Sequence, residues 1–157
     1  MLSPSMEVVD AFMAAATGDQ TPGRITGGVL AWLETHPDID QQHNILNQEC
    51  THTILMMAVM GSPDTTPVAR REMTELLLEH GANVNAQNDI GLSALMLAAL
   101  AGAEDIVRLL CSTGADVSLH AANGKTAVQA AQDAGHTEVA RLMLTYLVAA
   151  HAPMDKN

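Results

Sequence analysis

NDIGLSALMLAALAGAEDIVRLLCSTGADVSL, residues 88–119, is a pattern that returns on both sides of itself along this chain. A shift of 33 residues pairs glycine with glycine, hydroxyl residue with hydroxyl residue and arginine with arginine. The forward pairs are Gly91 with Gly124, Ser93 with Thr126, Gly102 with Gly135, and Arg108 with Arg141. The Gly-Ala-Asp-Val that ends at Val117 likewise matches the Gly-Ala-Asn-Val that ends at Val84. A fixed period of this length is typical of a repeat array.

Each copy opens one helix with Gly-x-Ser/Thr and closes a second with Gly-Ala-Asp/Asn-Val, and this resembles the ankyrin repeat family. The resemblance implies an all-α solenoid of helix-turn-helix repeats with short finger loops, stacked through contacts between neighbours. We therefore expect a degenerate N-terminal capping repeat at 1–40 and a repeat with a long finger and a seven-residue inter-helix insertion at 41–88. A regular repeat at 89–121, a C-terminal capping repeat at 122–150 and a tail at 151–157 should follow.

Apolar periodicity predicts the helices of these repeats. They are expected at residues 7–16, 24–35, 54–60, 68–80, 94–101 and 138–150, with another outer helix that buries Ile106, Val107, Leu109 and Leu110. Ser93 and Thr53 should act as N-caps, and Thr126 with Gln129 should form a capping box. Gly81 should supply the left-handed residue that ends the preceding helix.

Two segments depart from the regular repeat. Residues 41–52 form a polar connector that replaces the usual finger and is five residues longer than it. The insertion at 61–67 holds two prolines, which are expected to prevent a simple helix there and to leave a longer loop outside the stack. Ser62-Pro63 and Thr66-Pro67 are minimal contexts for a proline-directed kinase, but such pairs are common in loops.

The composition, 48 % hydrophobic and only 2 % aromatic, predicts a core of aliphatic side chains and methionine. The formal net charge, 7 − 18 = −11, argues against nucleic acid and anionic membranes as partners and favours a basic one. Two cysteines, Cys50 and Cys111, are too few for a secreted disulfide scaffold, so we expect free thiols. With no leader-like segment and no long apolar run, we expect a soluble monomer in the cytoplasm or the nucleus.

The sequence carries no pattern typical of a catalytic, metal or cofactor site. His43, Cys50 and His52 are the closest cluster of metal-ligating residues, and their spacing matches no standard zinc pattern. Phosphate-binding glycine loops and a Gly-x-Ser-x-Gly elbow are both absent. We expect a protein that is not an enzyme and uses no cofactor, with Cys111 packed as a small apolar side chain.

The resemblance further implies that a partner protein binds the concave face formed by the fingers and inner helices. The family's variable contact positions fall on Gln87, Asp89, Ile90, Leu92, Leu100 and Ala101 in the third repeat, on His120, Ala122, Asn123, Lys125, Asp133 and Ala134 in the fourth, and on Met60 in the second. Apolar members of this face should form a strip of Met60, Ile90, Leu92, Met96 and Leu100, with Met96 in place of the family's histidine. An exposed apolar strip favours docking. The alternative is that the connector 41–52 folds over the strip.

Three classes of function fit such a face. The first is a non-enzymatic adaptor or scaffold that binds another protein through a basic or apolar docking segment. The second is an inhibitor or regulatory subunit of an enzyme, since a four-repeat array is similar in layout to the ankyrin-type inhibitors of cyclin-dependent kinases. The third is a host-directed effector, because intracellular bacteria and parasites also use ankyrin arrays.

Overall fold

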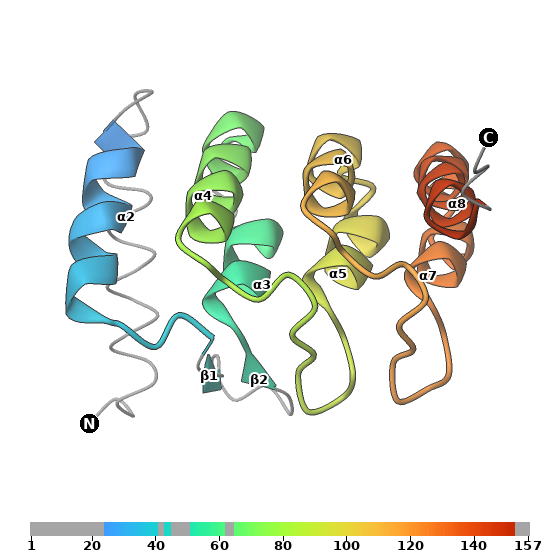
Figure 1. Cartoon of the computed structure of the whole chain (residues 1–157), viewed down its shortest axis with the longest axis horizontal. Coiled ribbons are helices and arrows are strands. Elements are labelled where there is room, and N and C mark those ends of the chain that lie inside the picture. Colours follow the sequence, from blue (N-terminus) through green and yellow to red (C-terminus); the bar gives the residue numbers. More distant parts are fainter. Residues whose placement is uncertain (1–23, 41–42, 45–50, 62–64, 153–157) are drawn as a thin grey trace, which may run out of the picture.

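The computed structural model describes residues 24–40, 43–44, 51–61 and 65–152, and it is a stack of antiparallel helices (Figure 1). The elements in chain order are α2 (Arg24–Thr35), β1 (His43–Asn44), β2 (Thr51–His52), α3 (Ile54–Met60), α4 (Pro67–Glu79), α5 (Ala94–Ala101), α6 (Glu104–Ser112), α7 (Ala127–Asp133) and α8 (Thr137–His151). The helix expected at residues 7–16 lies outside the described residues.

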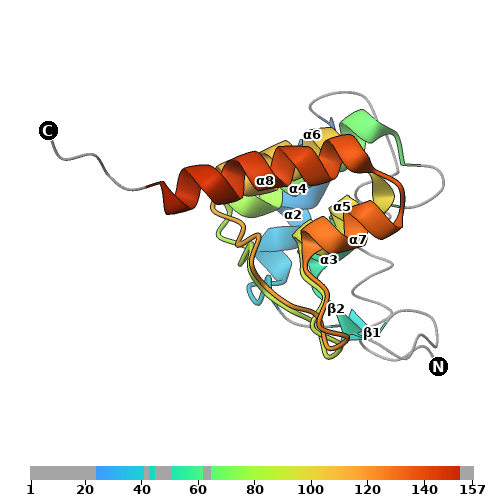
Figure 2. The same ribbon diagram turned by 90° about the vertical axis from the view of Figure 1, so that its right-hand side faces the viewer.

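The helices form two rows. The inner row is α3, α5 and α7, and the outer row is α2, α4, α6 and α8; each helix packs on its neighbours in the row. The loop from an outer helix to the next inner helix is a finger: finger 3 is residues 80–93 and finger 4 is residues 113–126. Viewed along the stack, the fingers lie one behind the other (Figure 2). The predicted all-α solenoid of helix-turn-helix repeats is confirmed.

The helix bounds agree closely with the sequence. α2, α3 and α5 span the predicted residues, and α8 extends one residue beyond the prediction at each end. α4 begins at Pro67, because the Thr66 side chain caps it and accepts a hydrogen bond from the Ala69 amide at 3.2 Å. The expectation that both prolines of the insertion oppose a helix is therefore wrong for Pro67. At the first helical position a proline loses no hydrogen bond, and its fixed φ suits the helix.

The three described inner helices, α3, α5 and α7, each follow a hydroxyl N-cap, as predicted. The side chains of Thr53, Ser93 and Thr126 accept hydrogen bonds from the amides of Met56, Met96 and Gln129 at 3.3, 3.3 and 3.4 Å. The Gln129 side chain accepts in return from the Thr126 amide at 3.0 Å, which completes the expected capping box. Caps of this kind contribute about 1 kcal/mol each, and they fix where the three inner helices begin.

The core lies between the two rows and is aliphatic, as the composition predicts. Its largest fully buried side chains are Ile54, Leu55, Met56, Met73, Leu77, Leu95, Met96, Ile106, Leu110 and Met143. Alanines with no exposed surface, Ala58, Ala98, Ala99 and Ala131, stand where the inner helices meet. A small side chain at such a contact lets two helices approach closely.

The long finger predicted at 41–52 contains a short antiparallel hairpin. β1 pairs with β2, with His43 opposite His52 and Asn44 opposite Thr51. Cys50 lies outside the described residues. This two-stranded ladder directly precedes the Thr53 cap of α3.

Hydrogen bonds join finger 3 to finger 4. The Ala122 amide donates to the Ile90 carbonyl oxygen at 3.0 Å. Nearer the outer row, the Asn85 side chain donates to the Gly114 carbonyl at 3.2 Å and accepts from the Asp116 amide at 2.7 Å. The fingers are thus held parallel by backbone groups of finger 4, so they present one continuous surface beside the inner row.

Candidate partner-binding surface

Most of the predicted contact residues are accessible. Asp89, Ile90, Leu100, His120, Asn123, Lys125 and Asp133 are exposed, and Met60, Gln87 and Leu92 are half-buried. Ile90 is 41 % exposed and Leu100 is 44 % exposed, so two large apolar side chains face solvent on the fingers and inner row. Ile90 and Leu100 are therefore exposed to solvent. The alternative, that the connector 41–52 covers the strip, concerns mainly residues outside the described part of the chain.

Met96 is a correction to the predicted apolar strip. Its side chain is only 1 % exposed, because it points from α5 into the core, and Met56 of α3 is fully buried. Methionine at these positions fills space between repeats, since its flexible thioether adapts to irregular gaps. The sequence suggested that Met96 makes the inner surface more apolar, but at 1 % exposure it adds almost no solvent-facing area, although it lines a pocket there.

Gln87 has a structural contact that the sequence did not reveal. Its side-chain amide donates to the carbonyl oxygens of Gly91 at 2.6 Å and His120 at 3.0 Å. One donor group therefore closes finger 3 on itself and ties it to finger 4. A partner that binds near Gln87 meets a side chain whose donors are already used.

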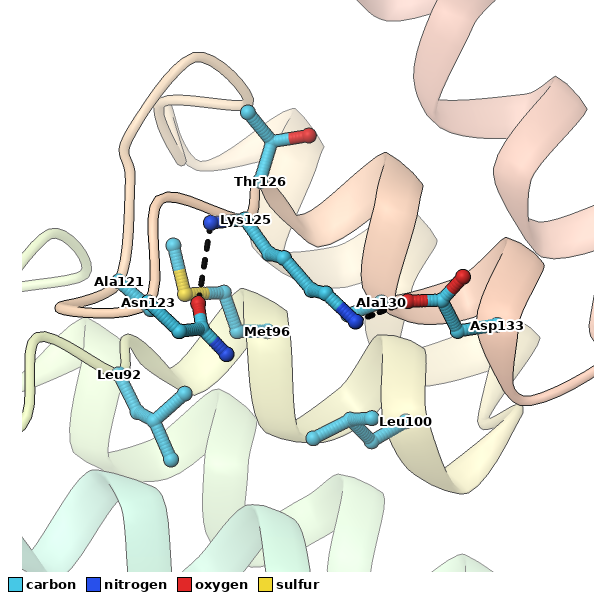
Figure 3. A pocket seen from close by; sticks show the side chains of 9 residues that line it. All are labelled: Leu92, Met96, Leu100, Ala121, Asn123, Lys125, Thr126, Ala130 and Asp133. Atoms are coloured by element: carbon cyan, nitrogen blue, oxygen red, sulfur yellow. Dashed lines mark hydrogen bonds and ion pairs between the residues drawn. The ribbon is translucent and has the colours of Figure 1, made fainter.

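A pocket of about 160 Å³ opens on the concave face between the third and fourth repeats (Figure 3). It is lined by Leu92, Met96, Leu100, Ala121, Asn123, Lys125, Thr126, Ala130 and Asp133. Finger 3 supplies Leu92, α5 supplies Met96 and Leu100, and the rest come from finger 4 and α7. Five of the predicted contact residues besides Met96 are thus brought together at one place.

The rim of this pocket carries an ion pair. Lys125 Nζ lies 2.5 Å from Asp133 Oδ2, and both side chains are more than half exposed. Figure 3 shows the Lys125 side chain crossing from finger 4 to the end of α7, on the other side of the pocket from Leu92 and Leu100. The Lys125 backbone amide donates a hydrogen bond to Asn123 Oδ1 at 3.0 Å, which fixes the main chain of finger 4 at this point. The pocket therefore has an apolar wall and a charged rim.

The basic residues of the described chain are distributed unevenly between its two sides. Arginines lie only in the outer row among the described residues: Arg24 in α2, Arg70 and Arg71 in α4, Arg108 in α6 and Arg141 in α8. Fingers 3 and 4 and the described inner row hold one lysine, Lys125, against Asp89, Asp116 and Asp133. The Ser118 hydroxyl and amide both donate to Asp116 Oδ1, at 2.6 and 2.8 Å, and they lower the pKa of that carboxyl. The described finger side thus has a formal charge of 1 − 3 = −2, and the outer helices, with five arginines and seven carboxylates, also total 5 − 7 = −2.

A second hollow, of about 400 Å³, lies under the end of α8. It is lined by Cys111, Gly114, Ala115, Asp116, Val117, Tyr146, Leu147, Ala149, Ala150 and His151. It is larger than the concave pocket, lies between the start of finger 4 and the outer helices α6 and α8, and holds none of the predicted contact positions. Cys111 is a half-buried free thiol there, and burial raises its pKa to about 11.

Other chemistry has little support in the described residues. Within them no group of three or more His, Cys, Asp or Glu side chains could hold a metal ion. None of the described helices is both long enough and apolar enough to cross a membrane.

The paired rows, the fingers and the concave pocket define a helix-turn-helix repeat array. A family model for ankyrin repeats, in three copies, matches residues 27–121, which is more than half of the chain. The chain therefore belongs to the ankyrin repeat family, whose arrays are generally protein–protein interaction modules and typically not enzymes. No curated protein matches this chain.

Proposed function

We propose that this protein is a non-enzymatic adaptor or scaffold that binds a partner protein through its concave finger and inner-helix face. The observation that carries the proposal is the concave pocket between the third and fourth repeats, with exposed Ile90 and Leu100 on the same side of the array. Exposed apolar side chains around a hollow mark interaction surfaces, because they lose contact with water when a partner covers them.

The finger ladder supports the proposal. Ile90 and Ala122 are joined through their backbones, so the apolar and acidic side chains of the two fingers are held in fixed relative positions. A preformed surface loses little conformational entropy on binding, which favours specific recognition. A standard interface buries about 1,200–2,000 Å² in total, and a four-repeat face is large enough to supply it.

The proposal places the protein in the cytoplasm or the nucleus as a monomer. Free thiols such as Cys111 suit a reducing compartment, and the acidic composition keeps copies of the chain apart. Each monomer then offers one concave face to its partner.

Site-specific photo-cross-linking in the native cell tests the proposal. A photoreactive amino acid at Leu100 should capture a partner protein, whereas the same group at Val148, which is 67 % exposed on α8, should not. The double substitution of Leu92 and Leu100 by Ser should abolish co-purification of that partner and leave the helical content unchanged. Capture at Val148 alone, or unchanged co-purification by the double variant, would show that the concave face is not the binding site.

A further inference from the structure

The concave pocket and its ion pair point to the chemistry of the partner. We infer that the partner inserts one apolar side chain between Leu92 and Leu100 and places a neighbouring Lys or Arg on Asp133, displacing Lys125. This inference rests on the proposed function and specifies which kind of segment the concave face takes.

The size of the pocket sets the size of the group that enters. A cavity of about 150 Å³ accommodates one benzene-sized apolar group, and this pocket measures about 160 Å³. Its wall is apolar, since Leu92, Met96 and Leu100 line one side and Ala121 and Ala130 line the other. The pocket therefore suits one side chain of the size of leucine, and it is too small for a packed helix face.

The ion pair at the rim sets the charge of the neighbouring group. Lys125 and Asp133 are 52 % and 57 % exposed as side chains, so water screens their attraction and the pair is weak. A cation on the partner can therefore replace Lys125 at Asp133 at little cost. The Lys125 side chain is then free to turn into solvent, since its bond to Asp133 is the one its ammonium makes in the described structure.

The surrounding charges favour a cation over an anion at this rim. The fingers and the described inner row carry three carboxylates and one ammonium, and the whole chain carries a net charge of −11. An acidic partner segment that took Lys125 from Asp133 would approach this negative surface and leave Asp133 without its cation. A basic segment meets attraction at long range and at contact.

A peptide titration monitored at Met96 tests the inference. Met96 lines the pocket, so its methyl signal should shift when a group enters. The protein is labelled with ¹³C at methionine methyl groups, and the Met96 signal is assigned by its loss in Met96→Leu. The probes are ten-residue Ser/Gly peptides with one Leu and one Arg placed one to four residues apart. Matched sets carry Glu in place of Arg, or Ser in place of Leu.

At least one Leu–Arg peptide should shift the Met96 signal and bind about fivefold or more tightly than its Leu–Glu match. Asp133→Asn should weaken that binding about two- to fivefold, the range of an exposed ion pair. Lys125→Gln should strengthen it, because the internal competitor for Asp133 is removed. Asp105→Asn, an equal charge change in the outer row on α6, is the matched control and should leave the affinity unchanged.

Three results would overturn the inference: tighter binding of Leu–Glu peptides, equal binding of peptides without Leu, or a Met96 signal that no peptide moves. A partner cross-linked at Leu100 in the cell, together with an unresponsive Met96, would leave the proposed function standing and remove only this assignment of the partner's chemistry. If no partner is cross-linked at Leu100 and no peptide shifts the Met96 signal, the proposed function is contradicted as well.

Discussion

The amide of Ala122 donates a hydrogen bond to the carbonyl oxygen of Ile90 at 3.0 Å, and this bond joins the tips of fingers 3 and 4. Gly91 follows Ile90 directly, with φ of 75°, and an added Cβ there would lie 2.8 Å from the Ala122 nitrogen. The glycine is therefore needed both for its backbone conformation and for the close approach of the next finger.

Substitution of Gly91 by Ala should destabilise the array more than the same change at Gly124. The two glycines are equivalent in the repeat and have φ of 75° and 78°, but nothing lies within 4 Å of a Cβ at Gly124. Gly124→Ala should cost about 1–2 kcal/mol for the left-handed backbone alone. Gly91→Ala should cost about 1–3 kcal/mol more, because a neighbouring backbone must move.

Urea denaturation followed by circular dichroism measures both free energies of unfolding. Equal losses for the two variants would mean that the close approach of the fingers contributes nothing to stability.

Met96 and Leu100 should separate stability from binding. Met96→Ala removes a side chain that is 1 % exposed, and it should lower the free energy of unfolding by about 2–5 kcal/mol. Leu100→Ala removes one that is 44 % exposed and should cost about 1 kcal/mol or less. Leu100→Ala should weaken partner affinity in a protein that remains folded, whereas any loss of affinity in Met96→Ala should come together with a loss of stability. A large stability loss for Leu100→Ala would place that residue in the core instead.

These two residues also show what the sequence predicted and what it could not. The repeat period located α5 and its Ser93 cap, because glycine turns and hydroxyl caps are local signals that neighbouring residues specify. It placed Met96 on the surface by correspondence with a family position, but burial depends on how closely the next repeat packs. The prediction of an exposed strip was therefore right for Leu100 and wrong for Met96.

The pocket could not be predicted from the sequence, for a related reason. Lys125 and Asp133 are eight residues apart, a spacing that brings no pair together on one helix. They meet because finger 4 returns beside α7, so their ion pair depends on tertiary structure. The hairpin of β1 and β2 was also missed, since two residues in each strand give no apolar alternation to read.

Asp116 should make stability depend on pH at the acidic end. Hydrogen bonds from the Ser118 hydroxyl and amide lower the pKa of Asp116 in the folded state from its ordinary value near 3.8. The folded state thus favours the carboxylate, so the contribution is complete above pH about 4 and is lost as pH falls through the lowered folded-state pKa.

Thermal midpoints of the wild type and Asp116→Asn, measured from pH 7 to pH 2, check this dependence. The wild type should be the more stable near neutral pH, and the difference should shrink below pH about 4, where both side chains become neutral. Asp105→Asn, which changes an exposed carboxylate of α6, corrects for the change in net charge. A difference that stayed constant down to pH 2 would contradict the proposed role of Ser118.

Cys111 should react slowly with alkylating reagents in the folded protein. Its thiol is half-buried, and burial raises the pKa from 9.0 to about 11, so the reactive thiolate is about 100-fold scarcer at pH 8. In a Cys50→Ser variant, the rate of iodoacetamide modification should rise on unfolding in urea by about that factor or more. A rate equal to that of the unfolded chain would show that the Cys111 environment is open.

The atoms of finger 4 nearest to a Cβ added at Gly91 are the Ala122 nitrogen and the Ala121 Cα and carbonyl carbon. All three are main-chain atoms, which every residue has. The close contact of finger 3 with finger 4 at Gly91 therefore does not depend on which side chains finger 4 carries. Tip residues can diverge freely to suit a new ligand while the spacing of the units is retained. In finger 4, the groups that fix the spacing of the repeats are main-chain groups, whereas a ligand would meet the side chains.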